Sequence, residues 1–315
     1  MRLEPFICRF YVMRSSGWQH SCGKQRRTTK MAEKRKFYGM RNDYMFHAVL
    51  QKNEEVLRNL LATLLEIDEA EIESCHIENP IELGKEIEGK ECILDVKLTL
   101  NNDKVINIEL QVYKQTHWIN RSLLYWARTY DNLKSGQDYS MLLPAYHIGI
   151  LDFTLFENHP KFMVQYQILD VEDGYLYSDK LCIKVLDLTQ LEKAKQEPET
   201  NKKLLKWASI FKAETLEELE QLASGEEVFE NMVVTMKKLS EDEKIRMQCE
   251  AREDYERSLL TEYNAGKSEG IEQGIQQGIA SERRNTEKER QRAEKESQRA
   301  DALAAEVERL RALLK

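Results

Sequence analysis

An alternation of apolar and polar residues between positions 94 and 112 limits most strongly what this chain can fold into. The even-numbered positions on both sides of an Asn-Asn-Asp turn are apolar: Leu94, Val96, Leu98, Leu100, Ile106, Ile108, Leu110 and Val112. The odd-numbered positions are mostly polar. Alternation with a period of two is typical of a strand with one buried face, so this stretch predicts a β-hairpin.

The predicted register of the hairpin sets two carboxylates against each other. With a three-residue loop at 101–103, Leu100 faces Lys104 and Asp95 lies directly opposite Glu109. Their Cβ atoms would be about 5 Å apart, which destabilises a sheet when both groups are ionised. Three interpretations stay open on spacing alone: a solvated polar face, a register shifted by one residue, or a metal site for a hard cation such as Mg²⁺.

Composition narrows the class of protein. The 315 residues carry a net charge of −8, so any contact with DNA requires a local basic groove rather than a basic surface as a whole. The six cysteines form no CxxC pair, which argues against a zinc ribbon or a disulfide framework and favours a reducing cytoplasm. No apolar run is long enough for a membrane span.

The first 37 residues differ from the rest of the chain. A short apolar run is interrupted by Arg9 and followed by a basic segment, without the apolar centre and cleavage site of a signal peptide. A second methionine, Met31, precedes the organised sequence. We therefore expect residues 1–37 to be a disordered extension or the result of a start assigned too early.

Other patterns surround the hairpin and predict a mixed α/β architecture. In chain order they are a helix over 42–65, a strand within 71–79, an aromatic-rich helix over 116–136, and strands over 145–153, 162–170 and 180–188. From about residue 200 the sequence is helical and strongly charged. This order indicates a sheet core followed by an all-helical region.

The C-terminal sequence has a signature of its own. Glycines at 266, 270, 274 and 278 run beside isoleucines at 271, 275 and 279. Each interior glycine costs roughly 1 kcal/mol of helix stability, but a small-residue stripe suits close helix packing. Leu303, Val307, Leu310 and Leu314 then follow coiled-coil spacing for about two heptads. Residues 263–315 are therefore either a charged helix with weak self-association or a coiled coil that forms a homo-oligomer.

Several stretches resemble one known family in the same order. They are "MRNDYMFHAVL", "ILDV…NIELQV", "RSLLYWARTYDNLKSGQDY", "LLPAYHIGILDFTLF", "LCIKVLDL", "KKLLKWASIF" and "GKSEGIEQGIQQG". Together they span roughly residues 38–280 and resemble the PD-(D/E)XK nuclease superfamily. More narrowly, they resemble the Rpn family of recombination-promoting nucleases, which is also labelled as transposases.

The resemblance implies both a fold and an activity. The fold would be α/β, with a restriction-endonuclease-like core at 38–190 built from a helix, a mixed sheet on an antiparallel meander, and a second helix. A helical region at 195–262 and the tail at 263–315 would follow. The activity would be Mg²⁺-dependent cleavage of DNA, with Mn²⁺ as a substitute, in support of recombination or of mobile-element movement.

The resemblance also assigns roles to residues of the hairpin. Asp95 and Glu109 match the motif carboxylates and would both bind the metal ion. Gln111 stands where the superfamily name writes lysine, and it would position water or phosphate. Leu94 replaces the motif proline, which does no chemistry. The glutamine bears on the catalytic rate more than on metal binding.

Residues near the hairpin have two interpretations each. Arg121, Tyr125 and Arg128 share one helix face, where the arginines either bind DNA phosphates or pair with surface acids, and Tyr125 either supports the site or fills core. Lys97 either contacts phosphate or balances the carboxylates. Asp43 either reaches the site or caps the first helix.

Two further expectations complete the sequence-based picture. Histidines 47, 76, 117 and 147 lack metal-ligand spacing and are expected to be core or surface residues. The rival to an endonuclease is a catalytically weak or inactive DNA-binding or scaffold protein on a nuclease-derived core. The missing lysine favours that rival, and the intact carboxylate pair opposes it.

Overall fold

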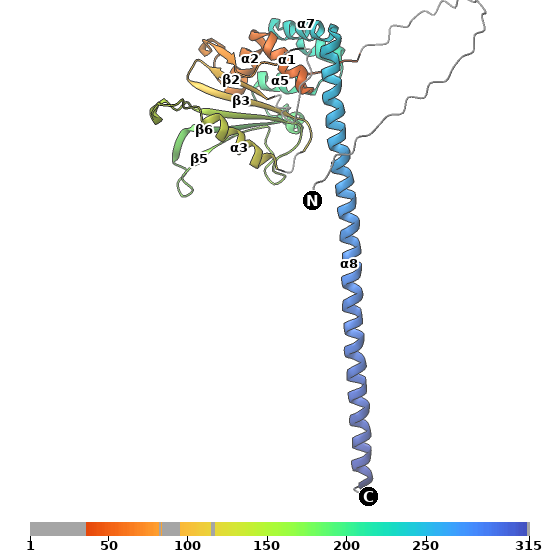
Figure 1. Ribbon diagram of the computed structural model, residues 1–315. Helices are drawn as coiled ribbons and strands as arrows, with labels where there is room; N and C mark the ends of the chain where they lie inside the picture. The colour runs from red at the N-terminus through yellow and green to blue at the C-terminus, as the bar shows by residue number, and fades with distance from the viewer. Residues whose placement is uncertain (1–35, 82, 84–94, 115–116, 314–315) are drawn as a thin grey trace, which may run out of the picture. The chain divides into compact units, whose positions relative to one another are not determined.

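A computed structural model describes residues 36–81, 83, 95–114 and 117–313 (Figure 1). The chain divides into two units, Met1–Lys36 and Phe37–Lys315, and the fold is that of the second unit. The expectations for residues 1–35, for Leu94 and for Leu314 lie outside the described residues.

Six strands form one mixed sheet (Figure 1). In spatial order they are β1 (Cys75–Ile77), β2 (Val96–Leu100), β3 (Lys104–Gln111), β4 (Ala145–Leu151), β6 (Leu176–Asp187) and β5 (Met163–Leu169). Strands β1 to β3 form an antiparallel meander. Strands β3, β4 and β6 run parallel, and β5 is antiparallel to β6. The mixed sheet on a meander, predicted from the resemblance, is confirmed.

The register of the β2–β3 hairpin is the predicted one, with Leu100 opposite Lys104. Asn101 and Asn102 adopt φ angles of 49° and 55°, a left-handed conformation that asparagine tolerates better than most residues. The Asn101 side chain also accepts hydrogen bonds from the amides of Glu73 and Ser74 at 2.8 and 3.0 Å. These contacts hold the loop, so the register shifted by one residue is wrong.

Helices α1 (Asp43–Lys52) and α2 (Glu54–Leu65) replace the single helix predicted over 42–65. Asn53 has extended backbone angles, and its side chain accepts a hydrogen bond from the Val56 amide at 3.2 Å. The one-helix prediction is wrong because this asparagine ends α1 and caps α2. Helix α3 (Trp118–Tyr130) also ends before the predicted Gly136.

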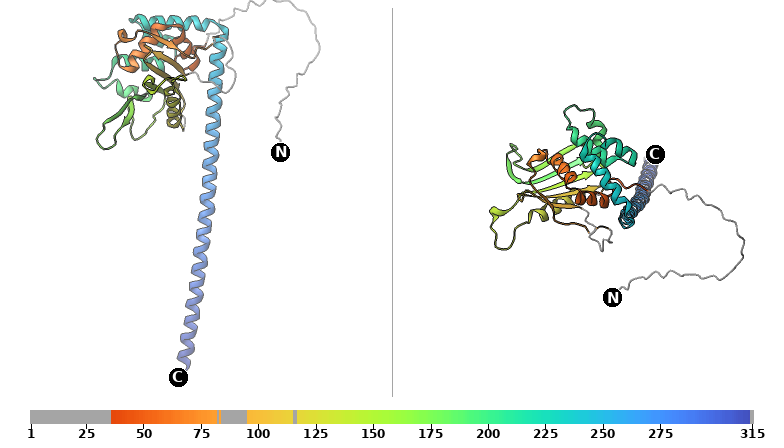
Figure 2. Two further views of the ribbon diagram at one scale, coloured as in Figure 1. Left: turned by 60° about the vertical axis from the view of Figure 1, so that its left-hand side comes forward. Right: turned by 90° about the horizontal axis from the view of Figure 1, so that it is seen from above.

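Helices cover both faces of the sheet (Figures 1 and 2). The apolar face of the hairpin packs against α1, α2, α5 (Lys202–Lys212), α6 (Leu216–Ala223) and α7 (Glu227–Glu241) in one core. The remaining short elements are η1 (Glu69–Glu71), η2 (Tyr139–Met141), η3 (Leu188–Gln190) and α4 (Leu191–Ala194). On the other face α3 contributes Trp118 to a smaller apolar cluster. Strand β3 is therefore buried on both faces from Val105 to Glu109.

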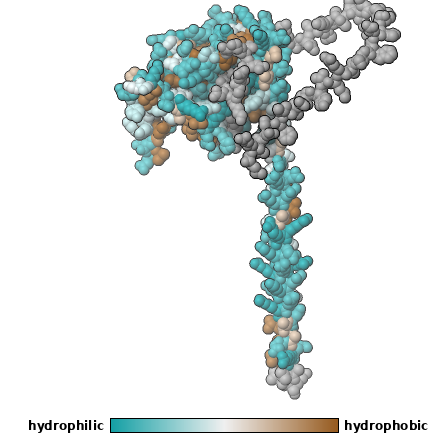
Figure 3. Space-filling view, viewed as in Figure 1, coloured by the Kyte–Doolittle hydropathy of each residue, from teal (hydrophilic) through white to brown (hydrophobic). Residues whose placement is uncertain are grey.

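The last helix, α8, runs from Glu243 to Leu313. Its first turns pack against α1 and α7, with Ile245 and Cys249 buried. From Arg257 to Arg311 every residue is exposed, and the surface is mostly hydrophilic (Figure 3). The coiled coil remains a prediction. Among the helices of the described residues, none has both the length and the apolar character that crossing a bilayer requires.

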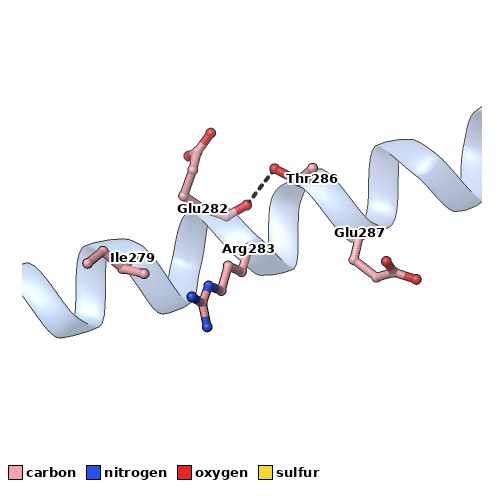
Figure 4. A pocket seen from close by; sticks show the side chains of 5 residues that line it. All are labelled: Ile279, Glu282, Arg283, Thr286 and Glu287. Atoms are coloured by element: carbon pink, nitrogen blue, oxygen red, sulfur yellow. Dashed lines mark hydrogen bonds between the residues drawn. The ribbon is translucent and has the colours of Figure 1, made fainter.

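A hollow on α8 beside Ile279 carries no site. Its lining comes from a single helix: Ile279, Glu282, Arg283, Thr286 and Glu287. Figure 4 shows these side chains pointing outward from consecutive turns, and the Thr286 hydroxyl donates to the Glu282 carbonyl at 3.0 Å. A binding site needs walls from more than one element, so this surface is only the exposed side of the helix.

Candidate active site

The hairpin brings Asp95 and Glu109 to the centre of the sheet. Asp95 directly precedes β2, and the pairing of Val96 with Ile108 places it opposite Glu109. Asp95 is 5% exposed and Glu109 is 1% exposed. The interpretation as a solvated polar face is therefore wrong, because both carboxylates are removed from water.

Helix α3 buries these carboxylates through a close contact at Gly149. In the sheet Glu109 pairs with Gly149 on β4. A Cβ atom added at Gly149 would lie 2.4 Å from Cζ2 of Trp118, the first residue of α3. Only glycine leaves room for the indole here, so the absence of a side chain at position 149 lets α3 cover the site.

Two nitrogen-bearing side chains approach the Glu109 carboxylate, but neither completes the hydrogen bonding of its oxygens. The Arg121 Nη2 atom lies 3.1 Å from Oε1, and the His147 Nε2 atom lies 3.4 Å from Oε2. Neither Glu109 oxygen has a hydrogen bond of good geometry within the described part of the chain. Buried carboxylate oxygens normally have partners, so Glu109 retains capacity for a further ligand.

Asn107 links the two carboxylates through His147. Its Nδ2 atom lies 3.4 Å from Oδ2 of Asp95 and 3.2 Å from Nδ1 of His147. Because the amide nitrogen can only donate, it assigns Nδ1 as the acceptor and places the hydrogen of a neutral imidazole on Nε2. That hydrogen faces Glu109. Asp95, Asn107, His147 and Glu109 therefore form one buried chain of polar contacts.

The electrostatics of the pair favour an added positive charge. Burial, followed by the charge of Glu109, raises the pKa of Asp95 to about 7, against the lowering effects of Arg121 and Asn107. Two carboxylates in a low-dielectric site cannot both be ionised without a compensating charge. Arg121 compensates one of the two negative charges, and a proton on Asp95 or a cation between the carboxylates would compensate the other.

The donor set fits Mg²⁺. This ion prefers hard oxygen ligands and is commonly held by one or two carboxylates, with waters and substrate phosphate completing the shell. Asp95 and Glu109 offer such oxygens, and those of Glu109 lack hydrogen bonds within the described residues. No group of three or more His, Cys, Asp or Glu residues within the described ranges could hold a metal ion. A cation here would therefore depend on the carboxylate pair together with water and substrate.

Asp43 lies at the edge of this site and binds the last helix. Asn42, and not Asp43, caps α1, because its side chain accepts from the Met45 amide at 3.1 Å. Instead, Nε of Arg252 donates a hydrogen bond to each carboxylate oxygen of Asp43, at 3.0 Å in both cases. The capping role for Asp43 is therefore wrong. Its charge contributes to the raised pKa of Asp95, and after burial it contributes most to raising the pKa of Glu256 to about 7.

The remaining predicted residues divide between the site and its surroundings. Gln111 ends β3, two residues beyond Glu109 on the same face, and is half-buried. Arg121 and Arg128 lie with their Cζ atoms 5.0 and 5.9 Å from the ring centroid of Tyr125, so the three share a helix face as predicted. Lys97 pairs with Glu78 at 2.9 Å, a carboxylate outside the hairpin, and its contact with DNA stays a prediction.

Three residues of the site were not predicted from the sequence. Asn107 lies on the polar face of the hairpin, and the same alternation that selected Glu109 could have found it. His147 reaches Glu109 only through the parallel pairing of β3 with β4. Arg252 is more than 200 positions from Asp43 (|i−j| = 209). No local pattern indicates the last two contacts.

A mixed sheet with paired buried carboxylates on two central strands, flanked by helices, is the architecture of a PD-(D/E)XK nuclease. The model of the family described as PD-(D/E)XK nuclease family transposase matches residues 40–263. The chain belongs to this family. Comparison with curated proteins and with solved structures gives no match.

Proposed function

We propose that this protein is a Mg²⁺-dependent DNA endonuclease. The observation that carries the proposal is the buried pair of Asp95 and Glu109, in which the Glu109 oxygens lack hydrogen bonds within the described residues. Arg121 compensates only one of these two buried charges, and a cation that the chemistry requires would compensate the other. The family description supports nucleic acid cleavage and a role in transposition.

Each site residue has a role in this proposal. Asp95 and Glu109 would hold Mg²⁺, with Mn²⁺ as an alternative ion for the same oxygen ligands. When bound, the ion lowers the pKa of a water and neutralises charge on the phosphodiester. The Gln111 amide can donate to a phosphate oxygen or orient the attacking water. It supplies no positive charge, whereas Arg121, 3.1 Å from Glu109, would bring a cation to the reacting phosphate.

DNA binding would use the face of α3. Arg128 is exposed beside Tyr125. Arg121 lies two turns earlier on the same face of α3 and also contacts the Tyr125 ring. Two guanidinium groups on one helix face form a local basic patch on a chain whose net charge is −8. Phosphate contacts depend on local charge, so the acidic average does not oppose this mode of binding.

The test is cleavage of supercoiled plasmid with Mg²⁺ by wild type, Asp95→Asn and Glu109→Gln. Asp103→Asn is the matched control, because it removes a carboxylate from the same hairpin at an exposed position. We expect losses on the order of 10³-fold in both site variants, since a metal ion supplies several kcal/mol of charge stabilisation, and no loss in the control. Equal cleavage by all four proteins would contradict the proposal.

The rival function is a DNA-binding scaffold that has lost activity, and Gln111 in the lysine position favours it. Substitution Gln111→Lys separates the two. If wild type is inactive and Gln111→Lys cleaves DNA, the rival is correct. A cleaving wild type supports the endonuclease, whatever this variant does.

We also propose that α8 promotes self-association and assists recombination or mobile-element movement. Its exposed isoleucines at 271, 275 and 279 lie beside glycines whose added Cβ atoms would meet nothing within 4 Å. Such a surface can approach a second helix closely. Deleting residues 263–315 should reduce the number of chains per particle in sedimentation, and an unchanged number would remove this role.

A further inference from the structure

Strand β5 forms one edge of the sheet and carries little protection against pairing. Within the described residues it pairs only with β6. Exposed edges are usually blocked by proline, by charged side chains or by a covering element. Met163–Leu169 reads MVQYQIL and contains neither proline nor charge. Ile168 and Leu169 at its end are 44% and 47% exposed.

The irregularity beside this strand does not interrupt its outer edge. Between the pairs Tyr166–Ile183 and Ile168–Ser178, β5 advances by two residues while β6 advances by five. The extra residues therefore belong to β6, on the inner side. Figure 1 shows β5 at the outer end of the sheet, and no further strand among the described residues pairs with it. A regular row of backbone donors and acceptors is available along β5.

The sequence of β5 is complementary to itself in antiparallel pairing. Around a two-fold axis at Tyr166, each residue meets the one at the same distance on the other side. Gln165 then faces Gln167 of a second copy, Val164 faces Ile168, and Met163 faces Leu169. Amide meets amide and apolar meets apolar at every position, which is what cross-strand pairs require.

The faces of the strand agree with this register. Val164 and Tyr166 are partly buried against the cluster that contains Trp118, Ile183 and Val185. By alternation Ile168 lies on their face but is more exposed. In the two-fold arrangement the exposed Ile168 lies beside Val164 of the second copy. Ile168, which is exposed in a single copy, is thus covered in the pair by Val164 of the second copy.

Charges at the two ends are also complementary. Lys161 precedes β5, while Asp170 and Glu172 follow it, and all three are exposed. Antiparallel pairing brings the basic end of one strand to the acidic end of the other, twice per dimer. A parallel arrangement would place like charges together. The ends therefore favour the same orientation as the strand itself.

We propose that β5 pairs with β5 of a second copy of this chain across a two-fold axis at Tyr166. Two six-stranded sheets then become one continuous sheet, and both edge strands are satisfied. A two-fold interface of this kind is self-complementary and closed. This surface is separate from α8 and does not depend on nuclease activity.

Cysteine cross-linking in the full-length chain tests the register. Tyr166→Cys places two thiols opposite each other with Cβ atoms about 5 Å apart, near enough for a disulfide after small adjustment. Val164→Cys alone places them about 13 Å apart, because the two copies are offset by four residues. We expect Tyr166→Cys to form dimers on a non-reducing gel. Val164→Cys and Ile168→Cys should cross-link only when mixed with each other.

Wild type gives the background from the native cysteines. Dimer formation by Tyr166→Cys no greater than wild type would overturn the proposal. Equal cross-linking by all three single variants would also overturn it, because that result indicates random collision or assembly through α8 alone.

A charge pair tests the same interface without cysteines. Gln165 is exposed and lies opposite Lys184 on β6, so Gln165→Glu adds an opposite charge beside that lysine and should leave folding unchanged. A charge in an edge strand disfavours pairing with a second copy, so we expect the dimer dissociation constant in sedimentation to rise at least about tenfold. The double variant Gln165→Glu with Gln167→Lys should restore it, because the new charges meet across the axis. An unchanged constant in Gln165→Glu would contradict the proposal.

Discussion

The two faces of the β2–β3 hairpin are both buried but are held by different forces. On one face Val96, Leu98, Ile106 and Ile108 belong to the main apolar core. On the other face Asp95, Asn107 and Glu109 meet His147 and Arg121 through polar contacts of 3.1 to 3.4 Å. The first face gains free energy from removing apolar surface from water. The second face loses part of its hydration without full replacement.

The difference shows where stability and function lie in this fold. An apolar face alone would be enough to hold the hairpin in register. The polar face keeps unsatisfied carboxylate oxygens in the same strands, and such strain concentrates at functional sites. The fold can carry this cost because the opposite face and the helices around it are well packed.

The largest effect is expected at Asp95, on the polar face. Its pKa rises from 3.8 to about 7 on folding, so between those values the unfolded chain releases the proton that the folded protein keeps. The free energy of unfolding therefore falls as pH rises from 4 to 7, by roughly 4 kcal/mol. Asp95→Asn should remove this dependence and stabilise the protein at pH 8.

Urea unfolding at pH 5 to 8 in EDTA measures this effect. Mg²⁺ should stabilise wild type at pH 8 but much less at pH 5, where the proton occupies Asp95. The opposite outcome would be a wild-type free energy of unfolding that rises with pH, together with an Asp95→Asn variant less stable than wild type. That outcome would mean that the polar face stabilises the fold, against the contrast between the two faces.

A smaller effect of opposite sign is expected on the apolar face. Leu98 is fully buried, so Leu98→Ala should lower the free energy of unfolding by about 3 kcal/mol through lost contacts and a cavity. Lys97→Ala, its neighbour on the other face, removes only a partly exposed ion pair and should cost less than about 1 kcal/mol. Comparable losses in the two variants would argue against the assignment of faces.

Gly149→Ala should cost about 2 kcal/mol, because the new methyl group overlaps Trp118. Replacing the indole by a smaller ring in Gly149→Ala with Trp118→Phe should recover part of this loss. Thermal unfolding of the single and double variants measures the coupling. Strictly additive losses would show that this contact does not hold α3 over the polar face.

The smallest effect is expected at His147. His147→Phe keeps the ring but removes the group that approaches Glu109. We expect Mg²⁺ affinity to fall about tenfold, which is the lower end for residues that orient metal ligands, with little change in cleavage at saturating metal. Calorimetric titration with Mg²⁺ and His117→Phe as a control measures it. Equal affinities would leave His147 a packing residue of β4.

The hairpin was predictable because its information is local. Alternation selects the buried face, and the loop of Asn101, Asn102 and Asp103 fixes the register from neighbouring residues. The same two facts place Asp95 opposite Glu109. What the alternation did not show is that the polar side is buried, because that depends on α3 and on the space left at Gly149.

Other features depend on contacts that no local pattern encodes. His147 and Glu109 meet because β3 and β4 run parallel, which requires a crossover through α3. Arg252 reaches Asp43 from the first turns of α8. The break at Asn53 was missed because its apolar flanks continue one helical period. Local capping decided the break against that periodicity.

The continuity of α8 has a consequence for reach. The helix runs from Glu243 to Leu313 as one element, so rigid backbone joins Arg252 to Leu303 over about 75 Å at 1.5 Å per residue. The distance between the ends of a flexible linker varies widely, whereas a continuous helix keeps the distance between its ends nearly constant. A molecule anchored near Leu303 would hold Asp43 at a set radius, equal to the length of roughly 20 base pairs of duplex.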